Sequence, residues 1–367
     1  MRTGYLYHEI FGWHDTGTFT ADLPSDPGAG LQPYLNYENA DTKRRIHELI
    51  VVSGLIEHLE RITPRLATDE ELMRVHTREH VDRIKAESAT RLGGDGGDLS
   101  TPFARGGFEI AAMAAGGAIE MMDAVISGKV RNGYALIRPP GHHAVRETGM
   151  GYCIFSNLAI AVMAAKQRYG SDFRVAVIDW DVHHGNGTES IFLDDPTVLT
   201  ISLHQDRLYP HETGDLDVKG VQGSNINIPL PPGTGKGGYR YALNEVVLPA
   251  LERFKPDLIA IASGFDSSVF DPLGRMLLTA EGYREITEML MSSADRLCQG
   301  RLMATHEGGY NATYSPFCGL FVLQQLSGVT KLTDPFNHAD RYPGHELKVH
   351  EKDVIDRAAQ SVHEIQS

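Results

Sequence analysis

Five short runs of β-branched and aliphatic residues alternate along the chain with longer segments of helical periodicity. The runs span Tyr134–Arg138, Arg174–Ile178, Val198–Ser202, Leu258–Ala262 and Leu302–Thr305. Runs that are apolar throughout are typical of parallel strands whose two faces are covered by helices. Helices are predicted at Asp41–Leu59, Gly107–Ile126, Ser156–Gly170, Tyr239–Phe254 and Thr279–Gly300. This alternation predicts an α/β fold with a doubly wound parallel sheet.

No repeat, low-complexity tract or linker divides the chain, so we expect one domain over residues 1–367. Two segments are irregular. Residues 22–42 are rich in Pro, Gly and Asn, and a loop of this length usually has a binding or assembly role. Residues 333–367 are polar and end in a predicted surface helix.

The composition excludes several classes of function. A net charge of −14 argues against a nucleic-acid partner, which calls for clustered Lys and Arg. No apolar run approaches the roughly 18 residues of a membrane helix, and the N-terminus becomes polar too early for a signal peptide. Cys153, Cys298 and Cys318 are odd in number and form no Cys-x-x-Cys pair, which fits a reducing compartment. We therefore expect a cytoplasmic protein without membrane contact.

Each of the five apolar runs leads directly into residues that can do chemistry. In chain order these are His142-His143, Asp179-Trp180-Asp181-Val182-His183, Leu203-His204, Gly264-Phe265-Asp266 and His306-Glu307-Gly308-Gly309-Tyr310. In open parallel sheets, ligands bind in the crevice at the carboxyl ends of the strands. The five clusters are therefore predicted to converge on one rim.

The second cluster indicates a metal site. Asp179, Asp181 and His183 alternate, so in an extended segment their side chains point the same way. Two of them, with Asp266 from a neighbouring strand end, would give an oxygen-rich site with one imidazole. Three protein ligands and an open position are the catalytic arrangement for Zn²⁺. The alternative, that the aspartates only cap the following helices, would explain one aspartate better than this cluster.

The first and last clusters supply candidate acid, base and hydrogen-bond donor groups. His142 and His143 follow Pro-Pro-Gly and could be ordinary turn histidines. Beside a metal, however, one neutral imidazole within reach of a bound water becomes a general base. Gly308-Gly309 could equally be a plain turn, but two glycines also let the backbone approach a substrate and present the Tyr310 hydroxyl to an oxyanion.

These clusters, in this order, resemble the histone deacetylase and acetylpolyamine amidohydrolase superfamily, especially bacterial histone deacetylase-like amidohydrolases. The resemblance is carried by Pro-Pro-Gly-His-His, Asp-Trp-Asp-Val-His-His-Gly-Asn-Gly and Glu-Gly-Gly-Tyr. It implies the single-domain, arginase-like α/β fold with an eight-stranded parallel sheet and an active site at the strands' carboxyl ends. It also implies a hydrolase that removes acyl groups from amines such as acetyl-lysine, with one Zn²⁺ per chain and structural K⁺. Together with the loop at residues 22–42, it indicates a homo-oligomer, dimer or tetramer.

The resemblance also assigns residues by position. Asp181, His183 and Asp266 resemble the zinc ligands, and His142 and His143 the tandem histidines, with His143 as general base and acid. Asp179 matches the carboxylate behind His142, and Tyr310 the carbonyl-polarising tyrosine. The implied substrate-binding residues are the rim residue Asp98 with Gly151, Tyr152, Tyr209 and Leu273. The implied potassium sites use Asp179, Asp181, His183, Ser202 and Leu203, and, for the second, Phe192, Asp195, Val198 and Ser224.

Three features depart from the family's usual pattern. Asn186 stands where many relatives carry an aspartate behind the second histidine, which should leave His143 a weaker base. Tyr152 and Tyr209 replace the usual phenylalanine walls of the channel, which favours a more polar acyl-amine. Leu273 occupies the gatekeeper position where polyamine-specific relatives place a glutamate.

Three alternative functions share parts of this pattern. An acetylpolyamine or other small-amide amidohydrolase would use the same site. A two-manganese ureohydrolase shares the fold but needs more bridging carboxylates, and here Asp266 is followed by Ser267. A non-catalytic acyl-lysine binder would be expected to have lost ligands or the tyrosine, and all are present.

Overall fold

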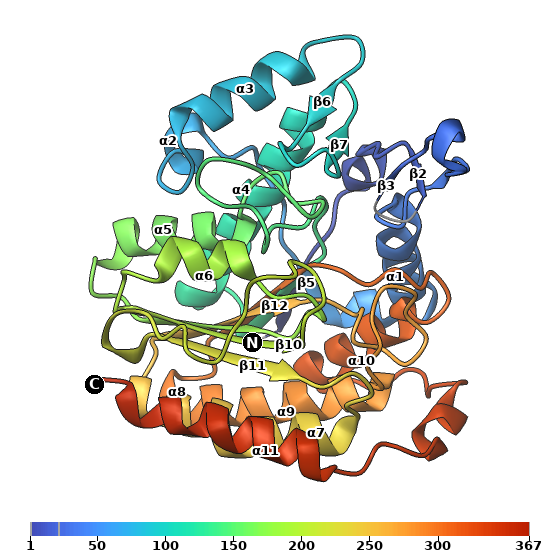
Figure 1. Cartoon of the computed structure of the whole chain (residues 1–367). Helices are drawn as coiled ribbons and strands as arrows, with labels where there is room; N and C mark the ends of the chain where they lie inside the picture. Colours follow the sequence, from blue (N-terminus) through green and yellow to red (C-terminus); the bar gives the residue numbers. More distant parts are fainter. Residues whose placement is uncertain (1, 21–22, 367) are drawn as a thin grey trace.

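The computed structural model describes residues 2–20 and 23–366 (Figure 1). Within these residues, eight strands form one sheet in the order β11-β10-β9-β12-β13-β8-β1-β5, and every neighbouring pair is parallel. The strands are β1 Thr3–Leu6, β5 Leu59–Arg61, β8 Asn132–Ala135, β9 Val175–Asp179, β10 Val198–Gln205, β11 Asn225–Leu230, β12 Leu258–Ser263 and β13 Leu302–His306. The predicted α/β fold with an eight-stranded parallel sheet is confirmed.

The five strands predicted from the sequence are β8, β9, β10, β12 and β13, although β8 begins at Asn132 rather than at Tyr134. The other three strands lack a clear local signal. β1 and β5 are very short, and β11 alternates Asn with Ile and contains Pro229. β11 tolerates the proline because it is an edge strand, paired only with β10.

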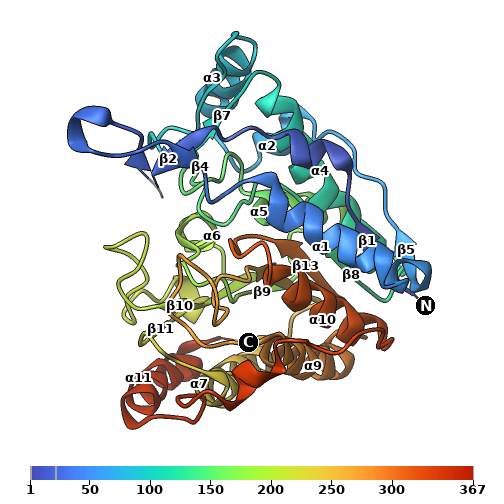
Figure 2. The same cartoon turned by 90° about the vertical axis from the view of Figure 1, so that its right-hand side faces the viewer.

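Helices cover both faces of the sheet (Figures 1 and 2). On one face α4 packs against α5, and on the other α9 packs against α10, which also contacts α1. The helices are α1 Ala40–Val52, α2 Asp69–Leu72, α3 Arg78–Ser88, α4 Gly107–Ile126, α5 Asn157–Tyr169, α6 Asn186–Phe192, α7 Lys236–Ala242, α8 Leu248–Phe254, α9 Ala280–Leu297, α10 Ser315–Ser327 and α11 Val349–Ala359. No helix of the described ranges is both long and apolar enough to cross a membrane.

Most predicted helices are confirmed, with two corrections. The helix predicted over Asp41–Leu59 ends at Val52, because Gly54 adopts a left-handed conformation (φ 72°) and Leu59 already belongs to β5. The helix predicted over Tyr239–Phe254 begins at Lys236 and contains a π-helical turn before Pro249, which has no N–H to donate.

The irregular segment predicted at residues 22–42 contains short elements of its own. β2 (Thr18–Thr20), β3 (Leu23–Pro24) and β4 (Tyr34–Leu35) form a small antiparallel sheet that projects from the body of the molecule (Figure 2). Asp22 lies outside the described residues, and the segment ends where α1 begins at Ala40. A second small sheet pairs β6 (Gly94–Asp95) with β7 (Pro102–Phe103). In the C-terminal segment, the predicted helix is α11, which packs on α7 and β11.

Candidate active site

Four of the five clusters predicted to meet at one rim do meet, whereas His204 of the remaining cluster contacts the Gly214 carbonyl and does not line the cavity. β9 lies between β10 and β12, and β13 is the next neighbour of β12, so Asp179 and Asp266 leave the sheet on adjacent strands. The loops that follow these strands enclose a cavity of about 170 Å³. Its lining residues are Ser100, His143, Gly151, Tyr152, His183, Leu208, Tyr209, His211, Leu273 and Tyr310.

Asp181, His183 and Asp266 form a buried cluster, of which His183 lines this cavity. One potential ligand atom from each lies within 4.8 Å of the others. The Nδ1 atom of His183 is 3.0 Å from Oδ1 of Asp181 and 3.2 Å from Oδ2 of Asp266. Within the described part of the chain, Oδ2 of Asp266 has no well-formed hydrogen bond. Gly308 makes this approach possible, since a Cβ atom there would overlap carboxylate oxygens of both aspartates.

The electrostatics of this cluster fit a divalent cation. Burial, together with the Asp181 charge, raises the pKa of Asp266 to about 6. Two buried carboxylates this close repel each other, and a cation bound between them relieves that repulsion. Two carboxylate oxygens and one imidazole nitrogen are suitable zinc ligands and leave a position for substrate or water.

A second group of metal-type side chains, His142, Cys153 and Glu307, is less suited to a cation. Burial raises the pKa of the Cys153 thiol well above its usual value, so the thiol stays protonated and is a poor ligand. Oε2 of Glu307 already accepts the backbone N–H groups of Gly141 (2.7 Å) and His142 (3.1 Å). Glu307 therefore holds the turn that carries the histidine pair.

The two histidines have different partners. Nδ1 of His142 lies 2.9 Å from Oδ2 of Asp179, and Nδ1 of His143 lies 2.8 Å from Oδ1 of Asn186. Burial alone would lower the pKa of His142, but Asp181 and Asp179 outweigh it and raise this pKa to about 10. Burial, with the nearby His142 and His183, holds the pKa of His143 well below its usual value. The neighbouring carboxylates thus favour the protonated form of His142, whereas burial favours the neutral form of His143.

Aromatic rings and two leucines, Leu208 and Leu273, line the cavity. The ring of Tyr209 stands edge-on to His143 at 5.0 Å, and the ring of Tyr152 lies 6.0 Å from that of Tyr310. Gly151 has φ 54°, and a Cβ atom there would come within 2.5 Å of the His143 ring and 2.8 Å of the Tyr209 ring. The backbone of residue 151 can lie this close to the two rings only because the residue is glycine.

Asp98 is the one predicted substrate-binding residue that does not line the cavity. Its Oδ2 atom accepts the N–H of Gly151 at 2.8 Å and the hydroxyl of Ser100 at 2.6 Å. Asp98 therefore holds the Gly151 wall from behind, and Ser100 faces the cavity in its place.

A buried ion cluster below Tyr310 was not predicted. The Lys43 ammonium lies 5.5 Å from the centre of the Tyr310 ring and 2.8 Å from Glu38, whose other oxygen is 2.8 Å from Nε of Arg138. A signal was present in the sequence. At helical spacing, Lys43 shares a face with Ile46 and Ile50, and a lysine on an apolar face needs a buried partner.

The residues of both predicted potassium sites are close together in space. Ser202 on β10 pairs in register with Asp179 on β9, and Asp179 is close in sequence to Asp181 and His183. In the second group, Asp195 N–H bonds the Phe192 carbonyl and Val198 N–H bonds the Asp195 carbonyl. The side chain of Asp195 is already paired with the Lys166 ammonium, so a cation there would have to use carbonyl oxygens.

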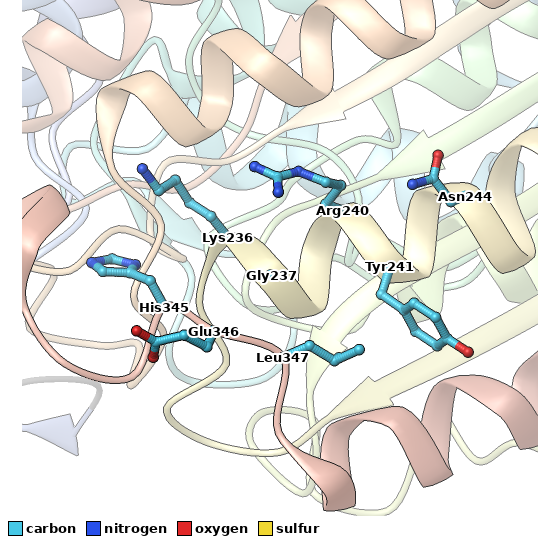
Figure 3. A pocket seen from close by; sticks show the side chains of 8 residues that line it. All are labelled: Lys236, Gly237, Arg240, Tyr241, Asn244, His345, Glu346 and Leu347. Atoms are coloured by element: carbon cyan, nitrogen blue, oxygen red, sulfur yellow. The ribbon is translucent and has the colours of Figure 1, made fainter.

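A larger cavity of about 420 Å³ lies elsewhere, between α7 and the segment before α11 (Figure 3). Its two cationic side chains are engaged, since Lys236 is 2.6 Å from Asp340 and Arg240 lies 3.0 Å from Glu285. None of the strand-end clusters reaches it, so it does not compete with the cavity at the rim as the active site.

The site combines a buried Asp-His-Asp cluster with a nearby neutral histidine and a tyrosine. In an α/β protein, this is the site of a single-metal hydrolase. Comparison with known proteins makes the assignment specific. Residues 36–325 match the histone deacetylase domain, and the chain belongs to the histone deacetylase family of zinc-dependent hydrolases that act on linear amides.

The relatives match almost the whole chain. It is 45% identical over 341 residues to a histone deacetylase-like amidohydrolase of Pseudomonas aeruginosa, covering 91% of this chain and 88% of that protein. It is 38% identical over 344 residues to histone deacetylase 8 of Arabidopsis thaliana, covering 91% and 89%. The crystal structure of the HDA15 HD domain matches with a TM-score of 0.85 at 31% identity, covering 99% and 96%.

Proposed function

We propose that residues 1–367 form one catalytic domain, a zinc-dependent deacylase that hydrolyses acyl-amides of the acetyl-lysine type. One observation carries the proposal. His183 of the buried Asp181–His183–Asp266 cluster lines the same cavity as His143 and Tyr310. One residue of the metal ligand set, a neutral base and a phenolic donor thus line one cavity of about 170 Å³, which suits a slender acyl-amine.

Each residue then has a defined task. Zn²⁺ held by Asp181, His183 and Asp266 would act as a Lewis acid toward the acyl carbonyl and lower the pKa of water. His143, neutral near pH 7, takes the proton of the attacking water, and a histidine of the pair returns a proton to the leaving amine. Asp179 orients His142 through its Nδ1 atom.

Tyr310 is suited to stabilise the oxyanion. Desolvation, with the nearby carboxylates of Asp266 and Asp181, raises its pKa well above the usual value, so the hydroxyl keeps its proton. A protonated phenol aimed at the carbonyl oxygen donates a hydrogen bond that strengthens as negative charge develops there. Tyr152, Tyr209 and Leu273 would enclose the acyl-lysine stem, with Gly151 at its narrowest point.

Other features belong to the same proposal. Structural K⁺ would bind at the two groups of residues that resemble the family's potassium sites. The three buried free cysteines suit action in the cytoplasm.

The protein would assemble as a homo-oligomer, either a dimer or a tetramer, and the assembly would bury the small β2–β3–β4 sheet. Tyr34 on this sheet is 69% exposed, and Trp13, in the 3-10 helix before β2, is 75% exposed. Light scattering of a Trp13→Ser/Tyr34→Ser variant tests the assembly.

The test of the function combines metal analysis with a turnover panel. We expect about one Zn²⁺ per chain, loss of turnover on chelation and hydrolysis of acetyl-lysine peptides in a panel that also contains acetylpolyamines and small amides. Two tightly bound manganese ions per chain, with activity on a guanidine substrate, would point to a ureohydrolase instead. Bound zinc without hydrolysis of any amide would point to an acyl-lysine binder.

A further inference from the structure

A buried carboxylate outside the strand-end motifs connects two walls of the active-site cavity. Asp271 lies on the loop between β12 and α9, and it is only 7% exposed. Its Oδ1 atom accepts the N–H of Leu273 at 2.9 Å, which is the local turn that aspartate side chains often make. Its Oδ2 atom accepts the N–H of Tyr310 at 2.7 Å, a residue 39 positions away on the loop after β13.

A second hydrogen bond runs in parallel. The side-chain amide of Asn311 donates to the Phe270 carbonyl at 2.6 Å. Residues 270–271 of one loop are therefore bonded to residues 310–311 of the other. On its N-terminal side, Tyr310 follows two glycines, and Gly309 has φ 117°, a conformation that only glycine adopts readily. Gly308 is held by Asp181 and Phe265, but the bond to the backbone N–H of Tyr310 itself comes from Asp271 on the neighbouring loop.

We propose that Asp271 is a positioning residue that fixes the Tyr310 hydroxyl over the reacting carbonyl by anchoring the Tyr310 backbone N–H. The inference rests on the proposed function and deepens it. A displacement of a catalytic group by about 1 Å can lower turnover roughly 10²-fold, so one hydrogen bond at this point has a large effect. Asp271 acts through Tyr310 and does not line the cavity.

Two substitutions weaken the anchor. Asp271→Ser retains one oxygen near the backbone, sufficient for the local turn to Leu273, but lacks the second oxygen that reaches Tyr310. Asp271→Asn retains the shape but has one acceptor oxygen for two N–H groups, so the bonds to Leu273 and Tyr310 cannot both form. We expect both variants to lower kcat for an acetyl-lysine peptide about tenfold or more, with KM within about threefold.

The matched control is Asp334→Asn. Asp334 is also buried, accepts the N–H of Phe336 two residues on and receives a bond on its other oxygen from the Tyr314 hydroxyl, but it lies away from the cavity. This variant should change kcat less than about twofold, with a comparable loss in thermal midpoint. Zinc content should stay unchanged in all three variants, which separates positioning from loss of metal or fold.

A double-mutant cycle with Tyr310→Phe tests whether Asp271 acts through the Tyr310 hydroxyl. If Asp271 acts through the hydroxyl, its substitution should cost less than about twofold in the Tyr310→Phe background. An equal loss in both backgrounds, or a wild-type-like kcat in both Asp271 variants, would overturn the inference. If Tyr310→Phe itself lowers turnover less than about threefold, the proposed function of Tyr310 fails instead, so the two failures are distinguishable.

Discussion

Nδ1 of His143 lies 2.8 Å from the side-chain amide oxygen of Asn186, whereas the adjacent His142 makes the same contact to the carboxylate of Asp179. His143, which lines the cavity, therefore has a neutral partner in Asn186. His142, which does not line it, has a charged partner in Asp179. Among the described residues, a positive charge on His143 would be compensated by a more distant carboxylate, that of Asp181. This asymmetry makes His143 the weaker base of the two and the one that is free to accept a proton near neutral pH.

The first prediction concerns this pair. Asn186→Asp places a carboxylate beside His143, which favours the imidazolium and raises the pKa of His143. Because the base must be neutral, the acid limb of the kcat/KM profile should move upward by about one pH unit. The measurement is the pH–rate profile of both proteins at equal zinc content. A downward shift would contradict the assignment of His143 as base.

Tyr310→Phe is expected to lower kcat on the order of 10²–10³-fold. The substitution removes one hydroxyl donor from the cavity and leaves the ring, so the free energy of unfolding should change little. Single-turnover kinetics and thermal unfolding check both parts. Tyr209→Phe is the control, since it removes a phenol from the opposite wall and should cost less than about tenfold.

Removal of the metal should affect stability as well as turnover. Without a cation, Asp181 and Asp266 face each other in a buried site, and the repulsion destabilises the folded state. A chelator should therefore lower the thermal midpoint of the wild-type protein. Asp266→Asn should bind zinc poorly, and its thermal midpoint should barely respond to the chelator. An equal response in both proteins would mean that the stabilising ion binds elsewhere.

The sequence predicted the strands that carry the clusters because buried parallel strands leave a strong local signal, as at Leu258–Ala262, now β12. It also predicted that Asp181 and Asp266 meet, since adjacent strand ends bring them together. It did not predict that Asp98 turns toward Gly151, because that depends on the fold of a glycine-rich loop. The link between Asp271 and Tyr310 is likewise set by tertiary contact between two loops.

Glu38 should govern part of the acid stability. Burial opposes its charge, but Arg138 and Lys43 outweigh burial and lower the pKa of Glu38 to about 2. Its unfolded value is about 4.3, so the stabilisation is complete above that pH and is lost as the pH falls toward 2. The free-energy difference between wild type and Glu38→Gln should be roughly 3 kcal/mol at pH 7 and shrink below about pH 4.5.

Urea unfolding between pH 7 and pH 3.5 measures this difference. The exposed Glu57 provides the control, because Glu57→Gln should leave the free energy of unfolding unchanged across the range. A constant difference between wild type and Glu38→Gln down to pH 3.5 would mean that the Lys43–Glu38–Arg138 cluster is not the group that titrates.

The last prediction concerns substrate choice and depends on Leu273, which lines the cavity. An acetylated polyamine carries secondary ammonium groups along its chain. Drawing one into an apolar channel costs several kcal/mol unless a carboxylate receives it. Leu273 offers only methyl groups, and cation–π contacts with Tyr152 and Tyr209 recover about 1–2 kcal/mol at best.

Acetyl-lysine has no second charge inside the channel, since its side chain is a neutral amide on a methylene stem. Acetyl-lysine peptides should therefore exceed acetylspermidine in kcat/KM by about tenfold or more. Leu273→Glu should narrow or reverse this ratio, because the carboxylate receives the ammonium and the lysine stem loses an apolar contact. Leu273→Gln introduces a side chain of the same size as glutamate but without its charge. It should lower kcat/KM for the acetyl-lysine peptide without raising kcat/KM for acetylspermidine. A wild-type preference for acetylspermidine would refute the gatekeeper argument and make the two tyrosine walls the determinant.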